Sequence, residues 1–89
     1  MKKAEIYTTI NTERAAAHVA YMTQRKERQA AEEQNGYIVD LKIRDMRERE
    51  ARYRGIWMST EALLIRVGGE IMTTTKEAET YNVYASKCL

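Results

Sequence analysis

The chain of 89 residues contains no phenylalanine, and leucine, isoleucine and valine together supply only 15 of its residues. A share this low accompanies disorder when the net charge is high, but the net charge here is only +2. We therefore expect one folded domain, residues 1–89, with a thin core that also uses methionine, tyrosine and alanine. A core of this size contributes about 3–5 kcal/mol, so a second copy or a larger protein would add useful stability.

Cysteine and long apolar runs are equally scarce. Cys88 is the only cysteine, which excludes an internal disulfide, and small secreted domains usually hold several. Residues 1–6 lack the apolar segment of a signal peptide. The longest apolar run, residues 62–65, is far below the roughly 20 residues of a membrane-spanning helix. These absences predict a cytoplasmic protein that makes no contact with a membrane.

Neither sign of charge dominates, because 15 lysines and arginines face 13 acidic residues. A protein dedicated to duplex DNA usually carries a stronger basic excess on one element. The balance argues against phosphate neutralisation as the main activity, but it leaves room for a local basic cluster.

The first third of the chain predicts a short strand and then a long helix. Residues 4–10 are rich in isoleucine, tyrosine and threonine, and Ile6, Thr8 and Ile10 alternate with Tyr7 and Thr9, which favours a strand. Residues 12–34 lack glycine and proline, and Asn35-Gly36 supplies residues that end a helix. The helical period appears in one stripe, Ala15, Val19, Met22, Lys26 and Ala30.

The two halves of this predicted helix differ. Its first half carries the apolar residues, whereas residues 23–34 are nearly all polar and include a same-face pair, Arg28 and Glu32. We expect the helix to pack through its first half and to project into solvent, or onto a partner, through its second. Val19→Asp should therefore unfold or dissociate the protein, and Glu32→Lys should leave its stability almost unchanged.

Residues 37–44 alternate apolar and charged side chains, which predicts a second strand. The alternative is a helix through Val39, Ile43, Met46 and Tyr53 that ends at Gly55. Three acid-before-base pairs four residues apart support a helix in the second part of this region. They are Asp45–Arg49, Glu48–Arg52 and Glu50–Arg54.

The last third contains signals for both strand and helix. Residues 53–58 favour a strand, and residues 63–67 and 70–73 suit a hairpin turning at Gly68-Gly69. A helix that begins near residues 59–62 and ends at Gly68 is the alternative. Thr74 and Glu77 form a capping-box pattern that starts a short C-terminal helix, with a stripe of Ala78, Tyr81, Ala85 and Cys88.

These segments together predict an α+β fold. A small antiparallel sheet would be packed by one long N-terminal helix, about 12–34, and followed by a short C-terminal helix. No internal repeat or linker divides the chain.

Residues that carry chemistry are few. His18 is the only histidine, no nucleophile or orienting carboxylate accompanies it in a motif, and we expect it at the boundary of the core. One histidine and one cysteine do not make a zinc site. Gly68-Gly69 precedes an acid rather than the Lys-Ser/Thr of a phosphate loop. We therefore expect no enzyme, no metal site and no cofactor.

The most concentrated feature is a basic and aromatic cluster within residues 42–57. Arginine binds phosphate and stacks on bases, and arginine, tyrosine and tryptophan are also enriched in protein interfaces. A solvated helix face laced by ion pairs is the alternative explanation. The candidate binding residues are Arg44, Arg47, Arg49, Arg52, Tyr53, Arg54 and Trp57.

The leading functional hypothesis is a small interaction module that binds and modulates a larger protein, as a regulator or inhibitor. The second hypothesis is a nucleic-acid-binding module that uses the cluster at 42–57. The thin core also suggests a homodimer, formed through a sheet edge or the apolar half of the 12–34 helix.

Overall fold

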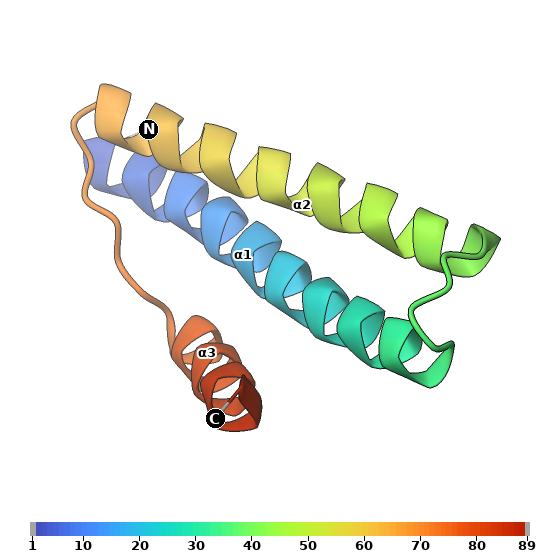
Figure 1. Ribbon diagram of the computed structural model, residues 1–89. Coiled ribbons are helices and arrows are strands. Elements are labelled where there is room, and N and C mark those ends of the chain that lie inside the picture. Colours follow the sequence, from blue (N-terminus) through green and yellow to red (C-terminus); the bar gives the residue numbers. More distant parts are fainter. Residues whose placement is uncertain (1, 89) are drawn as a thin grey trace.

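The computed structural model describes the backbone of residues 2–88 and the side chains of residues 2–81. It contains three helices: α1, Lys3–Gln34; α2, Leu41–Arg66; and α3, Thr75–Cys88. The helices α1 and α2 form a long antiparallel hairpin, and α3 packs on α1 (Figure 1). No strand occurs in residues 2–88, so the predicted α+β fold with a small antiparallel sheet is wrong.

Residues 4–10 are the first turns of α1 instead of a strand. The hydroxyl groups of Thr8, Thr9 and Thr12 each donate a hydrogen bond of 2.8 Å to the carbonyl four residues earlier. These bonds satisfy the threonine side chains inside a helix, so a strand-prone composition is compatible with helical backbone. The predicted helix of residues 12–34 is therefore the larger part of a longer one.

Residues 37–40 are a linker, and α2 begins directly after it, so the strand predicted over 37–44 is also wrong. The Asp40 carboxylate accepts a hydrogen bond of 2.9 Å from the amide of Ile43, which caps the new helix. The predicted end of the first helix is confirmed, since α1 stops at Gln34 and Gly36 has φ +62°. The alternative prediction for this region, a helix that ends at Gly55, gives the correct type of element, but α2 continues to Arg66.

The predicted strand at 53–58 and the predicted hairpin at 63–73 are also wrong, because residues 53–66 belong to α2 and residues 69–73 have no strand. Inside that helix the Thr60 hydroxyl donates to the carbonyl of Ile56 at 2.7 Å, so residues 59–62 do not begin a helix. Gly68 has φ +89°, and the Gly69 amide donates to the Leu64 carbonyl at 2.9 Å. A glycine pair serves a helix end as well as a hairpin, and here Leu64 is fully buried as part of the last turn.

The second half of α1 does not project into solvent, contrary to the expectation from sequence. Arg28 pairs with Glu50 of α2 and, at 3.0 Å, with Glu32, so the predicted Arg28–Glu32 pair is confirmed. Glu32 also pairs with Arg47 of α2 at 2.7 Å. Charged groups thus join the helices where apolar residues are missing, and this explains the polar sequence of the segment.

The helix α2 arranges its charges differently from the predicted pattern. Within the described residues, no ion pair joins Asp45 to Arg49, Glu48 to Arg52 or Glu50 to Arg54. Glu50 turns to Arg28 of α1, and Glu48 lies 3.9 Å from Arg44. The ion pair between Glu50 and Arg28 of α1 therefore replaces the pair between Glu50 and Arg54 that the sequence predicts within α2.

The core is thin, as the composition predicts. Among the described side chains the buried apolar ones are few and mostly small: Ala15, Ala17, Met22, Ile43 and Leu64. The molecule measures 51 × 26 × 15 Å, and its radius of gyration is 15.3 Å, against roughly 12 Å for a compact domain of this length. Its solvent-accessible surface is 6546 Å², whereas a compact monomer of this mass exposes about 5,400 Å². The fold therefore leaves about 1,100 Å² more surface open than a globular monomer does.

Candidate functional site

The three most exposed of the large apolar side chains described here lie at the linker between α1 and α2, at one end of the hairpin (Figure 1). We call residues 37–41 the hairpin tip. The exposed fractions of its four large apolar side chains are 73% for Tyr37, 70% for Ile38, 47% for Val39 and 77% for Leu41. A cluster of this kind on a small protein is typical of an interaction site.

The hairpin tip is held in one conformation by hydrogen bonds to the end of α1. The Tyr37 amide donates to the Glu32 carbonyl at 2.7 Å. The Asn35 side-chain amide donates to the Ile38 carbonyl at 2.7 Å and to the Asp40 carboxylate at 3.4 Å. Tyr37 also has φ +64°, a left-handed conformation that costs a bulky residue about 1–2 kcal/mol. The tip therefore presents its side chains from a fixed and locally strained backbone.

The residues of the predicted cluster at 42–57 do not share one face of α2. Successive residues of a helix are turned by about 100°, so the cluster divides between two flanks. Arg44, Arg47 and Arg54 follow one flank, and Arg49 and Arg52 follow another. Of these, Arg47 is held by Glu32, through two hydrogen bonds of 2.9 and 2.7 Å.

The two aromatic members of that cluster lie partly inside the hairpin. Trp57 stacks on His18 of α1, with ring centroids 4.1 Å apart and an interplanar angle of 8°. Tyr21 of α1 stacks on Trp57 at 5.5 Å. Tyr53 is half-buried. The structure thus gives Trp57 a packing role between α1 and α2, which the sequence alone does not reveal.

A buried ionic contact joins α3 to α1. The Arg14 guanidinium donates to both carboxylate oxygens of Glu77, from Nη1 to Oε2 at 2.9 Å and from Nη2 to Oε1 at 2.7 Å. His18 Nδ1 lies 2.6 Å from Glu77 Oε2. His18 is half-buried, as expected of a boundary residue, but its carboxylate partner comes from 59 residues further along the chain.

Glu77 also closes the capping box that the sequence predicts. The Thr74 amide donates to Glu77 Oε1 at 3.0 Å, and the Glu77 amide donates to Thr74 Oγ1 at 3.2 Å. Burial by itself would raise the pKa of Glu77, but hydrogen bonds from Arg14, His18 and the Thr74 backbone outweigh it and lower the pKa to about 2. The sequence identifies Glu77 as a cap, but nothing in the pattern around Arg14 indicates its partner.

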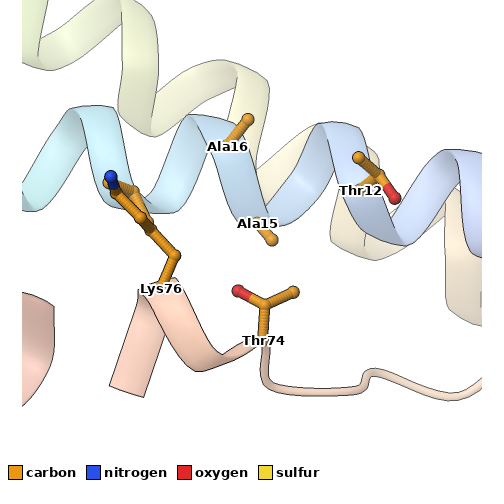
Figure 2. Close-up of a pocket in the computed structure, with 6 residues that line it drawn as sticks. Thr12, Ala15, Ala16, Thr74 and Lys76 are labelled. Carbon is orange, nitrogen blue, oxygen red and sulfur yellow. The ribbon is translucent and has the colours of Figure 1, made fainter. Parts of the chain in front are cut away.

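Two cavities border this contact. A groove of about 350 Å³ lies between α1 and the start of α3. Figure 2 shows Ala15 pointing toward Thr74, and Lys76 pointing toward α1. Its lining includes Ala15 and Val19 of the predicted apolar stripe, so these two residues face α3, whereas Met22 of the same stripe lines a cavity together with residues of α2. A second cavity of about 370 Å³ is lined by side chains of all three helices, and we call it the three-helix pocket.

Within the described part of the chain, no three histidine, cysteine or acidic side chains are grouped so as to hold a metal ion. The helices described here are all too short or too polar to cross a membrane. No family model, curated protein or solved structure matches the chain.

Proposed function

We propose that the chain is a non-enzymatic regulator or inhibitor that inserts its hairpin tip into an apolar pocket of a larger protein. The observation that carries the proposal is the exposure of four large apolar side chains within the five residues of the tip. Fully burying one such side chain contributes about 1.5–3 kcal/mol, so the tip holds enough apolar surface to anchor a complex.

The form of the tip favours a concave partner. The tip lies at one end of an elongated molecule whose longest dimension is 51 Å (Figure 1). Hydrogen bonds from the Asn35 side-chain amide and to the Glu32 carbonyl already hold the backbone of the tip. Binding would therefore cost the tip little conformational entropy. Tyrosine, the residue type of Tyr37, is one of those that contribute most of the binding free energy in protein interfaces.

The surface area of the whole chain supports a partner as well. The excess of about 1,100 Å² over a compact monomer is similar to the roughly 800 Å² that each side of a stable interface buries. The sides of the hairpin near the tip would then supply the rim of the contact.

The arginine cluster gives less support to nucleic-acid binding. A nucleic-acid surface gathers its positive charge on one face or along one element, whereas these arginines divide between two flanks of α2. One of them, Arg47, is neutralised by Glu32. Nucleic-acid binding is therefore one outcome of the test below instead of the proposal.

Site-specific photo-cross-linking tests the proposal in the cells that make the protein. A photoreactive residue replaces Ile38 in one variant and Ile65 in the control, since Ile65 is also exposed but lies in the last turn of α2. We expect a protein adduct from position 38 that position 65 does not give. The absence of such an adduct, or the same adducts from both positions, would overturn the proposal.

The protein captured at position 38 is then purified and titrated with point variants. Ile38→Asp and Leu41→Asp should each weaken binding at least tenfold, because each places a charge in an apolar contact. Ile65→Asp should change the dissociation constant by less than twofold. The proposal is wrong if the three variants behave alike, or if the adduct at position 38 is a second copy, a lipid or a nucleic acid.

A further inference from the structure

Among the described residues that line the three-helix pocket, every charged side chain is basic and none is a carboxylate. Most of these residues belong to α1 and α2, and Tyr81 belongs to α3. The described lining residues are His18, Tyr21, Met22, Arg25, Arg54, Trp57, Met58 and Tyr81.

The two guanidinium groups come from different helices and border the same cavity. Arg25 of α1 donates a hydrogen bond of 3.3 Å to the Tyr21 hydroxyl, and both residues line the pocket. Arg54 of α2 is exposed, and none of the ion pairs among the described side chains involves it. An anionic group at this edge of the cavity would give the Arg54 guanidinium a counter-charge.

The rest of the lining is apolar or aromatic. Met22 and Met58 contribute flexible thioether side chains that adapt to varied shapes, and the pocket also borders the Trp57 and Tyr81 rings. Its volume of about 370 Å³ falls within the range of small-molecule sites, which combine an apolar lining with a few polar groups.

We propose that the three-helix pocket binds a small organic anion, in which a carboxylate, sulfonate or phosphate group is attached to an aromatic or aliphatic body. The Arg54 guanidinium would bind the anionic group through charge-assisted hydrogen bonds, and the methionine and aromatic side chains would pack against the body. This inference does not depend on the proposed function, because the pocket and the hairpin tip lie apart. Arg54 of the pocket follows Leu41 of the tip by 13 residues of α2, which is about 20 Å along the helix.

A pair of fluorescent probes tests both halves of the recognition. The anionic probe is 1-anilinonaphthalene-8-sulfonate, and N-phenyl-1-naphthylamine has the same ring system without the sulfonate. Trp57 is the only tryptophan of the chain, so energy transfer from it reports a probe that binds beside it. We expect saturable transfer to the anionic probe, with a dissociation constant at least fivefold lower than for the neutral one. Equal affinity for the two probes, or no saturable transfer, would overturn the inference.

Point variants locate the binding site. Arg54→Gln should weaken binding of the anionic probe at least fivefold and leave the neutral probe within twofold, since only the guanidinium charge is removed. Arg44→Gln is the matched control, because it removes an exposed arginine from the same helix about 15 Å away. Ile38→Asp controls for binding at the tip. A loss with either control as large as that with Arg54→Gln would show that the probe binds elsewhere.

Discussion

Arg14 and Glu77 lie 63 residues apart in the chain and form a two-point ion pair whose side chains are only 2% and 3% exposed. The same carboxylate caps α3 through Thr74 and contacts His18. The formation of α3 and its attachment to α1 therefore depend on one side chain. Among the described side chains of α3, none belongs to the buried apolar core, whereas Glu77 is buried against α1.

The first prediction concerns Glu77→Gln. The change keeps the size of the side chain and removes its charge, which leaves the Arg14 guanidinium buried without a counter-charge. Removing one partner of a buried pair costs about 3 kcal/mol or more, so we expect α3 to detach while the α1–α2 hairpin stays folded. Hydrogen exchange of the α3 amides should then accelerate markedly, whereas exchange in the centre of α1 should hardly change.

Two further variants separate the ion pair from the cap. Thr74→Ala removes one capping bond and should cost about 1 kcal/mol. Glu79→Gln removes an exposed charge from the same helix and should have little effect. If all three changes accelerate exchange equally, the contact with Arg14 is not what holds α3.

The second prediction concerns pH. The pKa of Glu77 is lowered from 4.5 to about 2, so the folded state favours the charged carboxylate. Its contribution to stability is complete above pH 4.5 and is lost as the pH falls from 4.5 toward 2. An NMR titration of the Glu77 carboxyl carbon should give a midpoint near 2. Arg14→Gln should raise that midpoint, and an unchanged midpoint would show that Arg14 does not stabilise the charge.

The third prediction concerns the turn after α2. A β-carbon on Gly69 would lie 2.5 Å from Leu64 Cδ1 and 3.1 Å from Tyr7 Cδ1. Because Leu64 is fully buried, it has no free space to move into, and overpacking of this kind costs about 1–3 kcal/mol. Gly69→Ala should lower the melting temperature clearly. Gly55→Ala is the control, because a β-carbon there meets no atom within 4 Å, and it should keep or raise the melting temperature.

The sequence predicts correctly those features that depend on neighbouring residues. The end of α1 at Asn35-Gly36, the capping box of Thr74 and Glu77, and the pair of Arg28 with Glu32 are all present. Each follows from side-chain and backbone chemistry within four residues. The thin core follows from composition alone.

The fold class does not follow from local chemistry, because α1 packs on two sides. Ala15 and Val19 border the groove with α3, while Arg28 and Glu32 bind charged groups of α2. Because ion pairs hold the second half of α1 to α2, the sequence shows no apolar period there. The sequence therefore suggests, wrongly, that this half of the helix does not pack against the rest of the chain. The threonines of residues 8–12 favour a strand by propensity, yet their bonds to the α1 backbone are formed only in a helix.

The hairpin tip shows a similar limit. Its alternating residues 37–41 resemble a strand, and only the structure shows that residues 37–40 form an exposed linker fixed by Asn35 and that Leu41 begins α2. The ion pair of Arg14 with Glu77 leaves no local signal at all, since the two residues meet only after the chain has folded. Contacts of this range are set by tertiary packing rather than by propensity.

The last prediction reverses one drawn from the sequence. Glu32→Lys looks harmless if the end of α1 projects into solvent, but Glu32 accepts hydrogen bonds from both Arg28 and Arg47. These bonds, that from Arg47 above all, lower the pKa of Glu32, which shows that its charge is favoured in the folded protein. A lysine there would face two arginines, so we expect a lower melting temperature. The loss should shrink at high salt, because exposed charges are screened.

Two comparisons make this test decisive. Glu33→Lys places the same charge at the next position, where the side chain is exposed, and should leave the melting temperature nearly unchanged. Adding Arg47→Glu to Glu32→Lys restores one pair with reversed sign and should recover part of the loss, although Arg28 still repels the new lysine. If Glu32→Lys melts like Glu33→Lys, the ionic junction of α1 and α2 adds nothing measurable. Apolar contacts near Met22 and Ile43, both buried, would then hold that half of the hairpin together.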